Sequence, residues 1–388
     1  KSIYKILLSK VFVENPDIKK IKTIYKLLGY TRDIVGGKGE YNLTYMMISE
    51  LYNYTKLDIC PKKDILKIKN MVTTFIECLV KNLFIMKNDK YYEEEPYGSW
   101  KDMKYLCNYH IVNTSINIYE INDDILNKVI QLINAQLKCD EKCSVKTLLA
   151  KWIPREKSKK FGWLTHLLAV NYYDEWYTNE LNILQKASAK KKCLTHYRKL
   201  VSKINKELNT VQINQCSNNW KEIDFNKNVT SITLRKQSNA FMNKNKSGLI
   251  RDKTSTNEDR ILCSNNYENY IKDCKNKKVM AKGKCVSVID FVKDAINCNI
   301  ELNPLERDAI NNQWNSNKTS NKFKNMIAMI DTSASMEEEN SNPLYTAIGL
   351  GIKIAEKSNI GKRVLTFSKN PEWINLDDCG DFVSMVKK

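Results

Sequence analysis

The sequence predicts a chain of two parts, an α-helical scaffold followed by the beginning of a domain with a parallel α/β sheet. Three observations predict this fold class. Apolar residues recur at helical spacing up to about residue 310, a polar stretch follows, and short apolar runs after residue 326 flank one amphipathic helix. We therefore expect a helical scaffold over 1–310, a linker over 311–325, and the N-terminal part of a sheet domain over 326–388.

The helical part shows its pattern most clearly at residues 197–211, where apolar side chains recur every three or four positions and basic ones fill the other faces. Serial amphipathic helices over such a length are typical of stacked repeats, so we expect a HEAT-like array. Further buried faces are predicted at Ile3, Ile6, Leu7 and Val11, at Ile65, Ile68, Met71 and Val72, and at Ile125, Val129, Ile130 and Ile133.

The sheet domain is predicted element by element from residue 326. A short apolar run is typical of a buried parallel strand. In the helix that follows, Ser341 or Asn342 is the expected cap, Pro343 the first residue, and Gly361 the end. The order strand, helix, strand favours a parallel sheet. The expected strands are 326–330, 363–368 and 372–376. The inner face of the helix is expected to carry Leu344, Ala347, Ile348, Gly351, Ile352 and Ala355.

Asp331, Ser333 and Ser335 follow the first expected strand in the pattern D-x-S-x-S. Parallel sheets place their ligands at the carboxyl ends of the strands, and the next turn can bring both hydroxyls to the carboxylate. One charged and two neutral oxygens suit a hard divalent cation such as Mg²⁺, which keeps waters and an open position. The sequence therefore predicts a metal site at these three residues. The alternative is a turn in which the same side chains bond to the backbone.

The charge balance is strongly positive, because 63 lysines and arginines against 44 aspartates and glutamates give a net charge of +19. Such an excess favours a polyanion, with RNA the usual candidate and an acidic protein surface or lipid the alternatives. Coding drift in an AT-rich genome would also raise the lysine content. The best nucleic-acid candidate is the helix expected around 186–206, although a charged helix face is commonly only solvated. Its residues are Lys190, Lys191, Lys192, Arg198, Lys199 and Lys203.

A second basic stretch, 155–160, lies beside Trp152 and Trp163. Aromatic rings next to basic side chains can stack on bases. The helical spacing of the two tryptophans instead favours a place in the core.

Cysteine spacing and hydropathy indicate the compartment. The nearest pair, Cys139 and Cys143, has no second pair or histidine beside it, so neither a disulfide framework nor a zinc site is expected. No apolar run approaches the roughly 20 residues that cross a bilayer, and no signal-peptide pattern opens the chain. We expect a soluble, intracellular protein with reduced thiols and no membrane partner.

Other catalytic patterns fail on their residues. The segment 36–39 (GGKG) lacks the spacing of a phosphate loop and follows a helix, although Arg32 and Lys38 remain candidates for contact with an anion at the next helix. Asp331 lacks the glycine of an aspartic protease and the second acid of a D-x-D phosphatase. The three histidines are scattered, without a serine or cysteine constellation. We therefore expect no enzyme.

Several segments together resemble one family. They are Thr31–Glu40 (TRDIVGGKGE), Pro96–Asp102 (PYGSWKD) and Ala150–Pro154 (AKWIP), followed by DTSASM, PLYTAIGLGIKIAEKS and VLTFSKNPEW. In this order they resemble the uncharacterised plant and large-DNA-virus proteins that have a helical N-terminal region and a C-terminal von Willebrand A domain. That family is similar to the TROVE proteins, such as the Ro ribonucleoprotein autoantigen, in which a ring of helical repeats binds RNA.

The resemblance implies that a von Willebrand A (Rossmann-like) domain begins at 326 and that D-x-S-x-S belongs to a metal-ion-dependent adhesion site. In such a site the bound partner completes the coordination with its own carboxylate. Two departures matter. Ala334 stands where the family usually has glycine, and no threonine or further aspartate matches the expected downstream ligands, because Thr346 lies inside the first helix. The expected site is therefore half of the family's site.

These expectations together indicate a non-enzymatic binding protein. The metal-site domain would bind a carboxylate-bearing protein through a divalent ion, and the basic scaffold would hold RNA or another acidic surface. Two alternatives remain. One is a structural or assembly protein packaged in a virion, with a vestigial metal site, and the other is a Ro-like RNA-binding chaperone. The sequence leaves the oligomeric state open.

Overall fold

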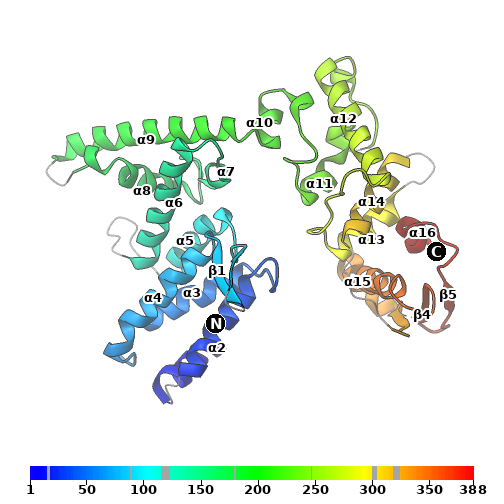
Figure 1. The fold of residues 1–388 in the computed structure, drawn as a ribbon, viewed down its shortest axis with the longest axis horizontal. Coiled ribbons are helices and arrows are strands. Elements are labelled where there is room, and N and C mark those ends of the chain that lie inside the picture. Colours follow the sequence, from blue (N-terminus) through cyan, green and yellow to red (C-terminus); the bar gives the residue numbers. More distant parts are fainter. Residues whose placement is uncertain are drawn as a thin grey trace. The chain divides into compact units, whose positions relative to one another are not determined.

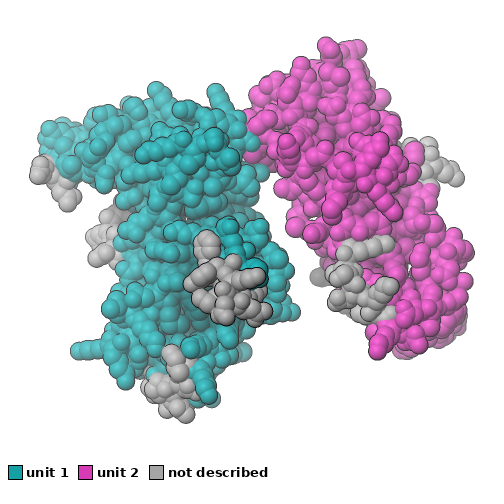
Figure 2. Space-filling view, in the orientation of Figure 1, with its two compact units in different colours: residues 1–208 teal, residues 209–388 magenta. Residues whose placement is uncertain are grey.

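The protein is described from a computed structural model, which covers residues 1–14, 18–87, 90–114, 123–178, 181–245, 247–298, 304–317 and 324–388. The chain is mostly helical, with a hairpin and a small three-stranded mixed sheet (Figure 1). The structure confirms the prediction that the chain is mostly helical and that strands occur after residue 326. The chain forms two compact units, residues 1–208 and 209–388 (Figure 2). Within the described ranges, no helix is long and apolar enough to cross a membrane.

Unit 1 (residues 1–208) is built from helices and one antiparallel hairpin. Its elements in order are α1 (Ser2–Ser9), the π-helical η1 (Lys10–Glu14), α2 (Ile18–Arg32), α3 (Asn42–Tyr54), α4 (Lys62–Cys78), β1 (Leu83–Lys87), β2 (Lys90–Glu94), α5 (Trp100–Thr114), α6 (Asp124–Lys142), α7 (Leu149–Trp152), α8 (Gly162–Tyr172), the 3-10 turn η2 (Asp174–Trp176) and α9 (Ile183–Glu207).

Three predicted apolar faces of unit 1 are confirmed as the buried sides of α4, α6 and α9. Helix α6 begins at a cap in which Asp123 accepts hydrogen bonds from the backbone of Ile125 and Leu126. Helix α9 begins with a capping box between Asn182 and Gln185. Amphipathic faces with well-formed caps explain why these helices were predictable from the sequence.

The predicted face of the first helix is wrong at Ile3, Ile6 and Leu7, whereas Val11 is buried as predicted. Ile3 is 84% exposed, whereas Tyr4 and Leu8 are buried and continue into buried Val11 and Phe12 of η1. Both sets have helical spacing, and in α1 the buried positions lie one residue after the predicted ones. Periodicity alone therefore does not identify the side that faces the core.

Unit 2 (residues 209–388) combines helices with the three-stranded sheet. Its elements are α10 (Val211–Cys216), η3 (Trp220–Glu222), α11 (Ser231–Phe241), η4 (Asp252–Thr254), α12 (Glu258–Lys275), α13 (Val288–Asn297), α14 (Pro304–Ser316), β3 (Ala328–Asp331), η5 (Ala334–Glu337), α15 (Glu338–Ala355), β4 (Arg363–Phe367), β5 (Trp373–Asn375) and α16 (Phe382–Lys387).

The predicted order of strand, helix and strand is present in unit 2. Strand β3 pairs in parallel with β4, and β5 joins the other side of β4 in the antiparallel direction. Helix α15 connects the two parallel strands but begins at Glu338, five residues before the predicted start at Pro343. The 3-10 turn η5 runs directly into α15, which leaves Pro343 inside the helix. Gly361 lies beyond the helix end, in the turn before β4, with a φ of +89°.

Two glycines of α15 allow this helix to pack closely against strand β3 and helix α13 (Figure 1). A Cβ at Gly351 would come within 2.4 Å of Ile330 in β3, and a Cβ at Gly349 within 2.2 Å of Val288 in α13. The inner face predicted for α15 is therefore confirmed at Gly351 and at buried Ile352 and Ala355.

Helices α13 and α14 share a core with the sheet. Buried Phe291 and Trp314 belong to the same apolar cluster as Ile330 and Val364. Residues 311–316, predicted as the start of a linker, form the last turns of α14. The compact units thus divide at 208/209, about 100 residues before the predicted end of the scaffold.

The second face of the sheet is apolar and exposed. The register aligns Met329, Leu365 and Trp373 across the three strands on the face opposite buried Ile330 and Val364. Met329 is 62% exposed and Trp373 56%. Parallel strands are normally covered on both faces, and no described element covers this one.

Candidate metal-binding loop and basic surfaces

The predicted metal residues lie together at the carboxyl end of β3. Asp331 is the last residue of the strand and pairs with Phe367 of β4. The chain then stays close to β4 for one more residue, because the backbone N–H of Thr332 donates to the carbonyl oxygen of Phe367 at 2.9 Å. This bond fixes the point at which the loop leaves the sheet.

The side chains of this loop form a connected row of oxygens. The backbone N–H of Ser333 donates to Oδ1 of Asp331 at 2.9 Å, and Oγ of Ser333 lies 3.0 Å from Oγ of Ser335. The pKa of Asp331 lies below its ordinary value because Ser333 donates to the carboxylate from its side chain and from its backbone. The turn therefore gathers one ionised carboxylate and two hydroxyls at a solvent-accessible edge of the sheet.

This donor set fits a hard divalent cation, which takes oxygen ligands and keeps waters. Three oxygens are half of the six that Mg²⁺ takes, so water or a partner would supply the others. Thr346 lies within α15, where its hydroxyl donates to the carbonyl of Asn342, and is not part of this loop. The described residues hold no group of three or more His, Cys, Asp or Glu side chains suited to a metal. A metal site here therefore depends on the serine hydroxyls.

Helix α9 presents most of the predicted basic residues to solvent. Lys191, Lys192, Arg198, Lys199 and Lys203 are exposed, opposite the buried face around Tyr197 and Ile204. Lys192, Lys199 and Lys203 follow one another by seven and four residues and so share one side of the helix.

Lys190 differs from the other predicted residues of α9. Its side chain is half-buried and lies near His166 of α8, whose pKa is lowered by burial and by the charge of Lys190. Arg198 forms an ion pair with Glu156 at 3.4 Å. The structure therefore leaves four of the six predicted basic residues exposed and without an ion pair among the described side chains.

An aromatic platform that the sequence did not predict lies beside this basic face. The rings of Tyr173 and Trp176 are stacked, with centroids 4.3 Å apart and planes 4° apart. His196 packs edge-on against Trp176, and Nζ of Lys192 lies 4.1 Å from the centre of the Trp176 ring. Stacked rings under a lysine suit the binding of unpaired bases. Both rings are half-buried. The available signal in the sequence was a tyrosine and a tryptophan three residues apart, just before the basic helix.

Two of the motif segments meet in a buried ion pair. Nε and Nη2 of Arg32 donate to the two carboxylate oxygens of Asp102 at 2.8 and 2.7 Å. The Tyr45 hydroxyl and the Ser99 backbone N–H donate to the same carboxylate at 2.6 and 2.8 Å. Arg32 is only 1% exposed. The suggested contact of Arg32 with an external anion is therefore wrong, because its fork is already engaged by Asp102.

A serine, a histidine and an aspartate also meet in unit 1, contrary to the expectation that the histidines stand alone. Oγ of Ser49 lies 2.7 Å from Nδ1 of His110, and Nε2 of His110 lies 3.1 Å from Oδ2 of Asp123. Ser49 and His110 are fully buried, and Asp123 is the cap of α6. We assign this network to the packing of α3, α5 and α6, since a substrate could not reach the serine.

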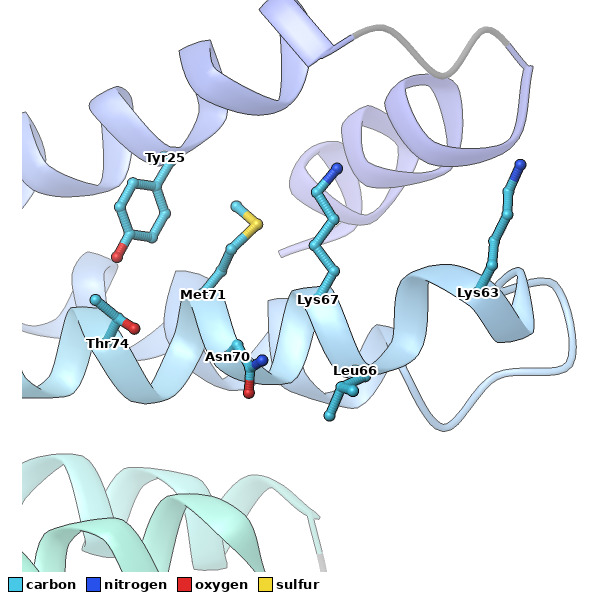
Figure 3. Close-up of a pocket in the computed structure, with 7 residues that line it drawn as sticks. All are labelled: Tyr25, Lys63, Leu66, Lys67, Asn70, Met71 and Thr74. Carbon is cyan, nitrogen blue, oxygen red and sulfur yellow. The ribbon is translucent and has the colours of Figure 1, made fainter.

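An open groove runs between α2 and α4, with a volume of about 560 Å³. Tyr25 reaches into it from α2, and α4 supplies the opposite wall (Figure 3). The hydroxyl of Tyr25 is buried without a hydrogen-bond partner in the described part of the chain. The residues from α4 are Lys63, Leu66, Lys67, Asn70, Met71 and Thr74.

Comparison with known proteins gives one distant relative. The chain is 25% identical over 370 residues to an uncharacterised protein of Acanthamoeba polyphaga mimivirus. The match covers 90% of this chain and 54% of the relative, so the chain spans about half the length of the curated relative it matches. No family model matches the chain, and no solved structure does.

Proposed function

We propose that this chain is a non-enzymatic binding protein that holds a carboxylate-bearing protein partner through a divalent cation on the loop of Asp331, Ser333 and Ser335. The observation that carries the proposal is the connected row of three oxygens at the carboxyl end of a parallel strand. The resemblance of this segment to a von Willebrand A domain, and of the helical part to TROVE-type repeats, supports the same assignment.

The loop residues divide the work between them. Asp331 supplies the negative charge, and the two hydroxyls supply neutral oxygens that leave the cation with net positive charge. A cation bound there, Mg²⁺ or another divalent ion, would attract the carboxylate of a partner. The alternative, a turn stabilised only by its own hydrogen bonds, predicts no affinity for cations.

Titration with Mn²⁺ tests the metal site directly. Binding to the full chain is followed by the loss of the free Mn²⁺ signal in electron paramagnetic resonance, with Mg²⁺ as competitor. Asp331→Ala is expected to remove one binding site, and Ser333→Ala to weaken it. The matched control is Asp252→Ala, because Asp252 is exposed in the same unit and forms no ion pair among the described residues. Equal Mn²⁺ binding by Asp331→Ala and the control would refute the proposal.

A second candidate function is the binding of RNA by unit 1. The specific observation in its favour is the stacked pair Tyr173 and Trp176 beside the lysines of α9. Phosphate contacts by lysine make such binding fall steeply with salt. Replacing Lys192, Lys199 and Lys203 by alanine is expected to lower the affinity for RNA. The remaining affinity should also depend less steeply on salt concentration. Unchanged binding would mean that the α9 face is only solvated.

The third alternative is a role in virus assembly with a vestigial metal site, and the one observation that favours it is the viral source of the relative. This alternative predicts that self-assembly of the purified chain is insensitive to chelator. Chelator-induced dissociation would contradict it.

A further inference from the structure

Unit 1 contains a second basic and aromatic surface that involves no residue of α9. Lys101, Lys104 and Tyr105 lie on one side of α5, since residues three and four apart share a helix face. Helix α7 packs against α5 and adds Trp152. Phe161, just before α8, completes the set of rings. We call these side chains, with Tyr41, Lys151 and Lys160, the lysine–aromatic cluster.

The ammonium groups in this cluster share the same rings. Nζ of Lys101 lies 4.8 Å from the centre of the Tyr41 ring, and Nζ of Lys104 lies 5.1 Å from that of Trp152. Three ammonium groups surround Tyr105, at 5.5, 5.7 and 5.8 Å from its ring centre. They belong to Lys101, Lys104 and Lys160. Lys101 and Lys104 lie one turn apart on α5, and Lys160 comes from the loop before α8, so the fold gathers the positive charge.

The positive charge of the cluster is not balanced within the described part of the chain. None of its four lysines forms an ion pair there. Asp102, next to Lys101, is engaged by buried Arg32, and Glu156 of the nearby loop pairs with Arg198. Burial lowers the pKa of Lys104, and the charge of Lys101 lowers it further. An anion placed among these ammonium groups would relieve their repulsion.

A buried arginine lies beside the cluster and closes its inner side. Nη1 of Arg32 is buried and has no hydrogen-bond partner among the described residues, although Nε and Nη2 are both engaged. The guanidinium carbon of Arg32 lies 4.3 Å from the centre of the Tyr41 ring. Tyr41 is 41% exposed, so one ring links the buried arginine to the accessible lysines. Arg32 itself is closed to ligands, so the accessible part of the surface is the Tyr41 ring and the lysines.

We propose that the lysine–aromatic cluster binds nucleotides, with Lys101, Lys104 and Lys160 contacting phosphate and the exposed Tyr41 ring stacking on a base. Lysine is a flexible point charge suited to phosphate, and every base offers a π-face to an aromatic ring. The site deepens the second candidate function by naming a surface for it, and it uses no residue of α9 or of the Asp331 loop. An acidic peptide would need the lysines but not the ring.

Binding of a fluorescein-labelled 12-nucleotide single-stranded RNA to the full chain tests this site. Lys101→Ala with Lys104→Ala is expected to raise the Kd about tenfold or more and to flatten the plot of log affinity against log salt by about 1.4, or 0.7 for each lost phosphate contact. The charge-matched control is Lys22→Ala with Lys26→Ala, two exposed positions on α2, which is expected to change the Kd less than threefold. The Lys101→Arg, Lys104→Arg pair keeps the charge and is expected to retain binding.

Tyr41→Ala separates base stacking from charge. This substitution is expected to lower the affinity for RNA but to leave the affinity for pyrophosphate, measured by competition, unchanged. Competition by ATP as strong as that by the 12-nucleotide strand would identify a free nucleotide as the ligand, and competition by the strand alone would identify nucleic acid. Both results support the site.

Two results would overturn it. One is wild-type affinity in the alanine pair. The other is an acidic peptide that binds as tightly as RNA and is unaffected by Tyr41→Ala. The Lys101→Ala, Lys104→Ala chain is expected to bind Mn²⁺ as the wild type does. This control distinguishes a failure of the lysine–aromatic cluster from a failure of the proposed metal site at Asp331. The alanine substitutions of Lys192, Lys199 and Lys203 test RNA binding by α9 separately, so the two surfaces can fail independently.

Discussion

The two units treat their distinctive polar residues in opposite ways. In unit 1 the motif residues Arg32 and Asp102 are buried and bond to each other. In unit 2 the motif residues Asp331, Ser333 and Ser335 are accessible, and the side-chain hydrogen bonds that they form among the described residues lie within their own turn. A buried pair stabilises the fold and is closed to ligands, whereas an accessible carboxylate is free to take one. Burial therefore separates structural motifs from candidate sites more clearly than their sequence patterns do.

The largest expected effect comes from breaking the buried pair. Asp102→Ala leaves the Arg32 charge unpaired and removes the acceptor of Tyr45 and Ser99, so we expect a loss of about 3–5 kcal/mol in the free energy of unfolding. Urea unfolding measures the loss, and hydrogen exchange is expected to locate it in α2, α3 and α5. Replacing both partners, as Arg32→Met with Asp102→Leu, is expected to recover part of it. A loss as small as that of Asp252→Ala would contradict the structural role.

The next effect concerns the buried histidine network. Burial raises the pKa of Asp123, but the hydrogen bond and charge of His110, the α6 backbone and Lys56 outweigh burial and hold that pKa below its ordinary 3.8. A depressed pKa means that the ionised carboxylate stabilises the fold above the unfolded pKa and that this stability is lost as the pH falls through the folded value. Asp123→Asn is expected to cost roughly 1.5–3 kcal/mol at neutral pH.

Measuring unfolding between pH 2 and pH 7 checks this prediction. The loss of stability below about pH 4 is expected to be shallower in Asp123→Asn than in the wild type, because the titrating group is gone. Parallel acid profiles would show that the His110 pairing contributes nothing.

A smaller effect is expected in unit 2. Gly351→Val places two methyl groups where a Cβ alone would meet Ile330 at 2.4 Å, so we expect overpacking to cost about 1–3 kcal/mol. Gly380→Ala is the control, since a Cβ there meets nothing within 4 Å. Thermal unfolding is expected to be altered by the first substitution only. Equal transitions would mean that α15 can move away from the sheet freely.

The sequence predicted what depends on neighbours along the chain. The faces of α4, α6 and α9 and the order of β3, α15 and β4 follow from local periodicity and caps. The same signal could not show that α13 and α14 pack with the sheet, because an amphipathic helix does not specify which core receives its apolar side. The predicted end of the scaffold at residue 310 and the division of the compact units at 208/209 therefore differ.

The contacts between distant residues were beyond the same reasoning. Arg32 and Asp102 are 70 residues apart, and Ser49 and His110 are 61 apart. The lysine–aromatic cluster likewise joins α5 to α7 and to residues 160 and 161. The D-x-S-x-S loop was predictable because its three side chains and its strand are contiguous. Sites within one turn are accessible to sequence analysis, and sites assembled by tertiary packing require the structure.

The smallest expected effect on stability is that of Asp331→Ala, and it sharpens the comparison with Asp102→Ala. Asp331 is accessible and its bonds stay within the turn, so in the presence of EDTA the urea midpoint is expected to match that of the wild type. Mg²⁺ is expected to raise the wild-type midpoint, because a ligand that binds only the folded state stabilises it. The substituted chain should show no such rise. A destabilised Asp331→Ala chain in EDTA would mean that the loop carboxylate serves the fold, as Asp102 does, and that the accessible motif is structural after all.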